Sequence, residues 1–361
     1  MRITFVSASI DNSGGFRVVT ALGQQLLAKG HDVRIIAPER AKHSIKAVLR
    51  SFLKRQRLSP RFHHSNHLGS LQAHATVVPH TAPLRPDDLP DADVVIATWW
   101  DTMNWLTDLE PNKGTVVHLV QDYELWGGDK REVDAVLATP GPKVAISSYL
   151  HDLLTCQFAQ QEVLLFPNAV DHSQFHSPPR TKNVEPTFGF VYSHDPRKGT
   201  DLVLRALEAA REQLPGLKVI AFGHHPHDDR RPLPSWVQYT VSPPQETLRD
   251  RYASCDAWLF GSRNEGFGLP ILEAMACRTP VIGMRAGAAA DLLGDDCGIL
   301  LENEDWLGMS KAILKVATMP AEEWHALSER AFARADQQRW DRVGATFEHW
   351  LEGLVAQTRR S

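Results

Sequence analysis

The sequence predicts an α/β protein with two parallel-sheet domains, and three observations lead to this class. The chain has 361 residues, about twice the length of a typical domain. Short apolar runs that are typical of buried strands alternate with helical patterns in both halves. Between the halves, residues 172–186 are rich in proline, serine and lysine, as a domain linker would be. We therefore expect one domain over residues 1–171 and a second over residues 187–335.

Composition indicates a soluble globular protein. Hydrophobic residues make up 43% of the chain and charged residues 23%, which is enough apolar material for two cores. The net charge of −4 gives no reason to expect nucleic acid as a partner. The four cysteines show no Cys-x-x-Cys spacing, which favours reduced core cysteines over disulfides or a zinc site. Because no apolar run is long enough for a membrane span and Met1–Ile10 is too short for a signal peptide, we expect a cytoplasmic protein.

The first half opens with a βαβ pattern. Arg2–Ser9 is an apolar run that predicts a buried strand, and the helical spacing begins at Phe16, directly after Gly14 and Gly15. A second strand is expected over Val33–Ala37. Two glycines before a helix also occur in dinucleotide-binding folds, but the third glycine of Gly-x-Gly-x-x-Gly is missing here, which disfavours an oxidoreductase.

The segment from Arg40 to Arg61 contains basic residues and no acidic one, and its apolar residues recur at helical spacing. It predicts a cationic amphipathic helix. Such a helix could rest on an anionic membrane surface or bind an acidic acceptor. The alternative is a solvated helix that covers the sheet with the stems of its lysine and arginine side chains.

Further strands are expected in the first half over residues 93–98, 115–120 and 144–148. Trp99, Trp100 and Trp105 follow the first of these strands and either line an acceptor site or pack in the core. Asp91-Ala92-Asp93 has the form of an Asp-x-Asp metal motif. It precedes its strand, however, whereas ligands of open α/β sheets gather at the carboxyl ends, so we interpret it as a loop feature.

The most informative stretch is Asn264–Gly283, with the sequence NEGFGLPILEAMACRTPVIG. A predicted strand, Ala257–Phe260, precedes it, and helix-forming residues follow the glycines. Glycines let a backbone pass close to a ligand, and the first turn of a helix carries about half a positive charge, so this loop suits a diphosphate. Glu265 and Glu273 beside it could accept hydrogen bonds from sugar and ribose hydroxyls.

This stretch resembles the Glu-x7-Glu motif of the retaining glycosyltransferases of family 4, which have the GT-B fold. Arg278 departs from the family pattern, where glycine is usual. The resemblance implies two Rossmann-like domains facing across a cleft, with a C-terminal helix that crosses back to the first domain, here expected within residues 336–361. It also implies a nucleoside diphosphate sugar as donor, a hydroxyl acceptor, a front-face mechanism and no divalent metal.

The resemblance extends to the remaining site residues. It implies donor-binding roles for Gly15, Arg197, Gly199, Gly223, Gly266, Phe267, Gly268, Leu269 and Glu273. It implies catalytic roles for Glu265, Lys198, Gln121 and Asp122. Gln121 stands where the family often has histidine, and the segment Gln-Asp-Tyr-Glu resembles a rhamnosyltransferase-like branch, so a deoxyhexose donor is an option beside a hexose. Tyr192 and Ser193 stand where a phosphate-binding arginine is usual, which leaves Arg197 either as its replacement or facing solvent.

Alternatives remain at this level. His224, His225, His227, Asp228 and Asp229 could bind a metal, although we expect a plain surface loop. The missing arginine and histidine leave room for a catalytically silent nucleotide-sugar-binding subunit. Non-hydrolysing sugar-nucleotide epimerases share the fold and bind the same ligands, but they need no acceptor. The favoured hypothesis is a retaining glycosyltransferase of polysaccharide biosynthesis whose acceptor is a glycan, a lipid-linked glycan or a small molecule.

Overall fold

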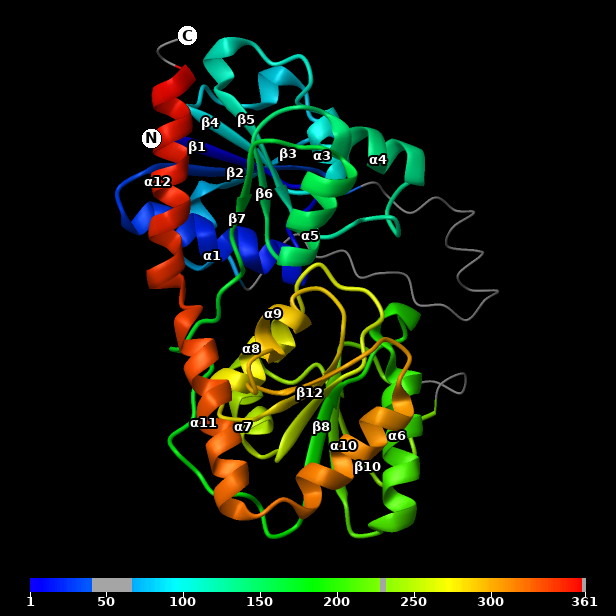
Figure 1. Ribbon diagram of the computed structural model, residues 1–361. Helices are drawn as coiled ribbons and strands as arrows, with labels where there is room; N and C mark the ends of the chain where they lie inside the picture. The colour runs from blue at the N-terminus through cyan, green and yellow to red at the C-terminus, as the bar shows by residue number, and fades with distance from the viewer. Residues whose placement is uncertain (41–66, 228–231, 359–361) are drawn as a thin grey trace. The chain divides into compact units, whose positions relative to one another are not determined.

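The computed structural model describes residues 1–40, 67–227 and 232–358, which form two compact units (Figure 1). The first unit consists of Met1–Ala145, His151–Phe166 and Gly344–Ser361. The second consists of Ile146–Leu150 and Pro167–Val343. Residues 172–186, the linker expected from composition, lie within the second unit.

The described part of the first unit contains a seven-stranded sheet in which every pairing is parallel, in the order β3-β2-β1-β4-β5-β6-β7. The central strands are apolar and buried on both faces, as a parallel sheet covered by helices requires. The strands are β1 (Arg2–Val6), β2 (Asp32–Pro38), β3 (Ala75–Val78), β4 (Val94–Ala97), β5 (Thr115–Val120), β6 (Lys143–Ala145) and β7 (Val163–Leu165).

The helices of this unit are α1 (Gly14–Ala28), α3 (Trp100–Asn104), α4 (Lys130–Ala138) and, from Gly344 onward, α12 (Trp340–Thr358). The short helix α5 (Ser148–Asp152) has residues in both units. Helix α1 begins two residues before the predicted Phe16, because Ser13 caps it by accepting a hydrogen bond from the Phe16 amide at 3.2 Å. The predicted cationic helix between Arg40 and Arg61 lies outside the described residues, apart from Arg40 itself.

The terminal helix packs on the first unit, as the sequence predicts. Glu348 of α12 accepts hydrogen bonds from Lys29 and from His31, the latter at 2.7 Å. The rings of Phe347 and Phe166 lie 5.1 Å apart, and Phe347 is fully buried. The burial of Phe347 against Phe166 fixes α12 to the first unit.

The second unit repeats the same architecture with six described strands, again all parallel, in the order β10-β9-β8-β11-β12-β13. The strands are β8 (Thr187–Val191), β9 (Lys218–Gly223), β10 (Val237–Val241), β11 (Ala257–Phe260), β12 (Val281–Met284) and β13 (Ile299–Leu301). The helices are α6 (Thr200–Gln213), α7 (Leu248–Ala253), α8 (Leu269–Ala276), α9 (Ala289–Leu293), α10 (Trp306–Thr318) and α11 (Ala321–Gln337). Helix α6 packs with α10 on one side of the sheet and α8 with α11 on the other (Figure 1).

Each sheet has one point where the strand order reverses. In the first unit it lies between β1 and β4, and in the second between β8 and β11. In open parallel sheets the loops that leave the two strands at this point diverge to opposite faces and leave a crevice at the carboxyl edge, where ligands bind. These two switch points are therefore where functional side chains are expected.

The segment Asp91-Ala92-Asp93 has a structural explanation. Asp93 accepts a hydrogen bond from the Arg2 amide at 2.8 Å, and Asp91 accepts one from Asn112 at 2.9 Å, both at the amino-terminal edge of the sheet. The Asp-x-Asp segment is thus a structural loop feature, as we expected.

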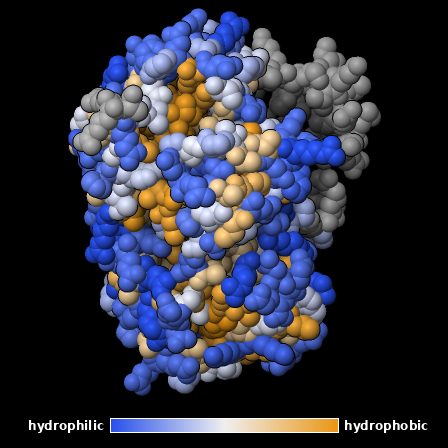
Figure 2. All heavy atoms as spheres, turned by 45° about the horizontal axis from the view of Figure 1, so that its top comes forward, coloured by the Kyte–Doolittle hydropathy of each residue, from blue (hydrophilic) through white to orange (hydrophobic). Residues whose placement is uncertain are grey.

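Among the described residues, none of the helices combines the length and the apolarity of a membrane span. Hydrophilic residues dominate the face shown in Figure 2, with hydrophobic residues in smaller patches between them.

Candidate functional site

The switch point of the second unit carries an ion pair between two of the predicted residues. Lys198 ends the short 3-10 turn Pro196–Lys198 after β8, and Glu265 lies in the loop after β11. Lys198 Nζ donates to Glu265 Oε1 at 2.6 Å, and the Ser262 hydroxyl donates to the same oxygen at 2.9 Å. The lysine side chain is 39% exposed and the glutamate 15%, so this pair is accessible from solvent.

Glycines explain how the two loops approach so closely. Gly199 has a φ of 60°, and a Cβ there would lie 1.8 Å from the Gly261 carbonyl oxygen. A Cβ on Gly261 would in turn lie 2.5 Å from a Val203 methyl group. Only glycine fits at this crossing, and the crossing is what brings Lys198 beside Glu265.

The glycine loop continues into helix α8. Gly268 precedes the helix with a φ of 98°, a conformation that favours glycine. Pro270 has no N–H, and the Ile271 amide donates to the Gly268 carbonyl at 3.0 Å. The amides that this turn could offer to an anion are therefore those of Gly268 and Leu269, together with that of the preceding Phe267.

Glu273 lies five residues into α8 and is 4% exposed. Its Oε2 accepts a hydrogen bond from the hydroxyl of buried Tyr252 at 2.6 Å. Tyr252 packs between the rings of Trp258, Phe222 and Phe175. The glutamate is thus held rigidly on a buried aromatic cluster, and the sequence analysis missed this partner, since nothing in the spacing of Tyr252 distinguishes it from an ordinary core residue.

The guanidinium of Arg197 pairs with Asp195, with Nε 2.9 Å from Oδ2. Arg263, which the sequence analysis did not select, makes a bidentate pair with Asp201 at 2.8 and 2.9 Å and also pairs with Glu304. Hydrogen bonds to these carboxylates raise the pKa of Arg263 further above its ordinary value. Arg263 therefore ties the glycine loop to the start of α6 and to the loop before α10.

Two more of the predicted donor-binding glycines, Gly223 and Gly266, have close neighbours in the structure. A Cβ on Gly223 would lie 2.4 Å from the Tyr192 carbonyl oxygen, so this strand end admits only glycine. Tyr192, at the position of the missing arginine, is buried with its ring against Tyr239. Gly266 accepts a hydrogen bond at its carbonyl from the Ser147 hydroxyl at 2.8 Å, within the second unit. Gly223 lies at the end of β9 rather than in the loops that carry Lys198 and Glu265.

In the first unit, Gly15 and Gln121 lie together at the other switch point. A Cβ on Gly15 would be 3.5 Å from the Gln121 carboxamide. Gln121 Nε2 donates to the Thr98 carbonyl at 3.0 Å, while its Oε1 is buried without a hydrogen-bond partner in the part of the chain that the structure describes. An unpaired amide oxygen is an acceptor ready for a hydroxyl donor.

Asp122 lies in the loop after β5, next to Gln121. It accepts hydrogen bonds from the Tyr123 amide at 2.8 Å and from the indole of exposed Trp126 at 3.1 Å, and so shapes the loop after β5. Glu124, two residues on, is buried and accepts a hydrogen bond from the Trp100 amide at 2.7 Å. Burial raises the pKa of Glu124 well above its ordinary value, although this hydrogen bond opposes the shift.

The histidine cluster falls partly outside the described residues, which exclude Asp228 and Asp229. His224, His225 and His227 lie in the described part, where His194 Nε2 donates a hydrogen bond to the Pro226 carbonyl at 3.0 Å. Within the described ranges, no group of three or more histidine, cysteine or acidic side chains has a metal-binding arrangement.

The structure therefore assembles two clusters from the predicted residues. The second unit brings together Lys198, Gly199, Glu265 and the turn at Gly268, and the first unit brings together Gly15 and Gln121. The former combines a cation with backbone amides, which is suited to a phosphate group, and adds a carboxylate suited to hydroxyls. The latter offers an uncharged amide acceptor.

Comparison with known proteins gives consistent results. A family model described as "Glycosyl transferases group 1" matches residues 172–334. The O-antigen chain mannosyltransferase B of Escherichia coli is 33% identical over 107 residues, which cover 29% of this chain and 27% of that protein. The D-inositol 3-phosphate glycosyltransferase of Rhodococcus erythropolis is 30% identical over 190 residues, or 48% of this chain and 40% of that protein. The chain thus aligns with less than half the length of these curated relatives.

Solved structures match along almost the whole chain. The sucrose-phosphate synthase of Thermosynechococcus elongatus aligns with a TM-score of 0.73 at 19% identity, covering 99% of this chain and 100% of that structure. Anabaena HepE, in a complex with UDP-glucose, aligns with a TM-score of 0.73 at 14% identity over 98% of this chain and 100% of its own. The predicted class of two parallel-sheet Rossmann-like domains, as in GT-B glycosyltransferases, is confirmed. The segment that carries the Lys198 and Glu265 cluster is accordingly one that matches the glycosyl transferases of group 1.

Proposed function

We propose that this protein is a retaining glycosyltransferase that moves a hexose or deoxyhexose from a nucleoside diphosphate sugar to a hydroxyl acceptor. The observation that carries this proposal is the 2.6 Å pair of Lys198 and Glu265 at the switch point, beside the amino terminus of α8. Phosphates bind at such termini, and a neighbouring lysine adds the charge that a diphosphate needs. The match of residues 172–334 to group 1 glycosyl transferases supports the same activity.

In this proposal the second unit holds the donor. Lys198 and the amides of residues 267–269 stabilise the negative charge that develops on the leaving diphosphate, so the step needs no divalent metal. Glu265 is released from Lys198 and accepts hydrogen bonds from hydroxyls of the transferred sugar. Glu273, oriented by Tyr252, accepts hydrogen bonds from the ribose hydroxyls.

The first unit holds the acceptor. Gln121 cannot titrate, so it orients a hydroxyl through its unpaired Oε1 rather than removing a proton. We therefore favour front-face transfer: the bond from the sugar's anomeric carbon to the phosphate oxygen breaks, and a bond to the acceptor oxygen forms on the same face. The proton of the acceptor hydroxyl passes to the leaving phosphate oxygen, and the anomeric configuration is retained.

The activities of two relatives narrow the range of substrates to test. The Escherichia coli relative is a mannosyltransferase of an O-antigen chain, and the Rhodococcus relative transfers to D-inositol 3-phosphate. Both are consistent with a hydroxyl acceptor, and the first supports a role in polysaccharide biosynthesis. The structurally similar HepE is in a complex with UDP-glucose, which makes UDP-sugars the first donors to examine.

Calorimetric titration with UDP, GDP, dTDP and ADP, followed by the sugar nucleotides of whichever base binds, tests the donor site. We expect selective binding of one nucleoside diphosphate and acceptor-dependent consumption of its sugar nucleotide. Conversion of the donor without any acceptor would instead indicate an epimerase. Binding without turnover in the presence of acceptors would indicate a silent subunit, and absence of binding by the folded protein would refute the donor site.

We also propose a cytoplasmic location with contact to the inner face of the membrane through the basic segment 40–61, on the strength of its sequence pattern alone. The protein should then sediment with anionic vesicles at low salt and less at high salt, because salt screens this attraction. Failure to sediment at either salt concentration would refute membrane contact.

A further inference from the structure

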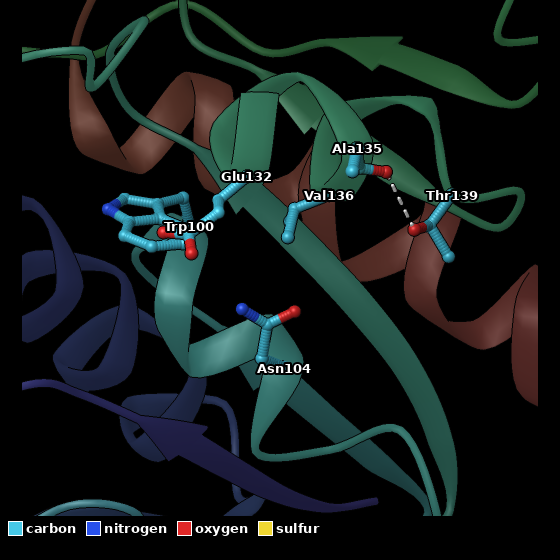
Figure 3. Close-up of a pocket in the computed structure, with 6 residues that line it drawn as sticks. All are labelled: Trp100, Asn104, Glu132, Ala135, Val136 and Thr139. Carbon is cyan, nitrogen blue, oxygen red and sulfur yellow. Dashed lines mark hydrogen bonds between the residues drawn. The ribbon is translucent and has the colours of Figure 1, made fainter. Parts of the chain in front are cut away.

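A surface groove in the first unit lies between helices α3 and α4, with a volume of about 340 Å³. Trp100 and Asn104 of α3 form one wall, and Glu132 and Val136 of α4 form the other, with Thr139 at the far end (Figure 3). The volume lies within the range of roughly 300–1,000 Å³ that is usual for small-molecule pockets. None of the roles proposed above uses this groove.

The aromatic wall of the groove is fixed in place. The Trp100 amide donates to buried Glu124 at 2.7 Å, and the ring meets that of Trp99 edge-on at 5.6 Å. On the loop after β5, a Cβ on Gly128 would lie 2.3 Å from the Trp100 ring, so glycine lets this loop close against the indole. The indole is therefore held in one orientation before any ligand arrives, which reduces the entropy cost of binding.

The polar groups of the groove retain hydrogen-bonding capacity. The side-chain amide of Asn104 donates one N–H to Asp101 at 3.2 Å, and its other N–H and its Oδ1 are available to a ligand. The Glu132 carboxylate has no hydrogen-bond or ion-pair partner in the described part of the chain. In Figure 3 the Glu132 side chain extends toward the Trp100 indole, and the Asn104 carboxamide points toward Val136. Thr139, in contrast, already donates to the Ala135 carbonyl at 3.1 Å.

We infer that this groove binds one neutral sugar ring of a glycan. The narrow exposed strips of Trp100 and Val136, which are 7% and 5% exposed, provide apolar contact for the C–H face of a sugar, while a carboxylate and a carboxamide suit vicinal hydroxyls. The negative charge of Glu132 disfavours phosphorylated or sulfated rings. The inference rests on the proposed function in one respect. The acceptor of the glycosyl transfer is then an oligosaccharide, and one of its additional sugar rings occupies the groove.

Ligand-observed NMR titration of the full chain with three neutral tetrasaccharides, maltotetraose, α-mannotetraose and chitotetraose, tests the inference. We expect saturable binding of at least one of them and weaker or no binding of a sulfated tetrasaccharide. Glu132→Ala should weaken binding about tenfold or more and Asn104→Ala about fivefold, as expected for loss of a charged and of a neutral hydrogen bond. Glu132→Gln, which keeps an acceptor oxygen, should lose less than Glu132→Ala.

The matched control is Glu162→Ala, which removes an exposed glutamate of the same unit that lies outside the groove. It should bind the tetrasaccharide like the unaltered chain. Nucleotide binding, measured in parallel, should be the same in all variants, so that a failure of the groove is distinguished from a failure of the donor site. Absence of binding by all three neutral tetrasaccharides, or equal losses in Glu132→Ala and Glu162→Ala, would overturn the inference.

Discussion

Replacement of Lys198 by methionine separates the proposed catalytic role of its amine from any structural role. The pair with Glu265 is partly in solvent, with 39% of the lysine side chain exposed. Such pairs contribute about 0–1 kcal/mol to folding. Glu265 does not become unpaired in the variant, because Ser262 still donates to the same oxygen at 2.9 Å. The free energy of unfolding of the variant should therefore lie within about 1 kcal/mol of that of the unaltered protein.

The expected effect on catalysis is much larger. Removal of one donor that stabilises a developing oxyanion typically lowers kcat by a factor of about 10²–10³, or about 3–4 kcal/mol of transition-state stabilisation. Lys218→Met is a matched control, since it removes another lysine–glutamate pair of the same unit, with Glu185, far from the loops of the site. Turnover of the sugar nucleotide and urea unfolding should be measured on both variants. Unchanged kcat in Lys198→Met, or a loss of activity matched by an equal loss of stability, would refute the role of the amine.

Two further predictions concern stability. His118, on β5, is buried and carries a pKa lowered to about 3 by burial and by neighbouring Lys143, so it binds its proton mainly in the unfolded chain. Folding stability should therefore fall by about 2 kcal/mol between pH 7 and pH 5, and His118→Leu, but not His325→Leu at an exposed position, should remove this slope in urea titrations. Arg278→Gly removes the backbone strain of a non-glycine residue with a φ of 58°. It also removes three contacts of the guanidinium: the 3.0 Å hydrogen bond to the Ser177 carbonyl, the ion pair with Glu329 and the cation–π contact with the Phe332 ring. Its free energy of unfolding should drop by about 1–2 kcal/mol, and an equally or more stable variant would show that these contacts contribute nothing.

The sequence predicts the strands and the glycine loop well because these depend on local patterns. The apolar runs at β1, β8 and β11 and the spacing of Glu265 and Glu273 are all visible in short windows. A short stretch of sequence does not reveal the order in which the strands lie in the sheet. Lys198 and Glu265 are 67 residues apart and meet because β8 pairs with β11, while β9 and β10 lie on the other side of β8.

Departures from a family pattern are equally hard to interpret without the structure. Arg278, where glycine is usual, adopts the left-handed conformation of a helix end and compensates by linking residues 177 and 329. Arg197 reads as a candidate phosphate ligand from its position beside Lys198, yet its guanidinium contacts Asp195 two residues away. The partners of Arg278 are fixed by tertiary structure, and the partner of Arg197 by the local turn that Asp195 caps.

The two units show how one topology supports two chemistries. In both sheets the strand order reverses beside the first strand, and in both a glycine loop there leads into a helix. The second unit places the charged pair of Lys198 and Glu265 at this point, which suits a phosphate and its sugar. The first unit places Gln121 there, neutral and with an unpaired oxygen, which suits a hydroxyl and keeps charge away from it. The division of labour that we propose between donor and acceptor would follow from which side chains lie at these strand ends.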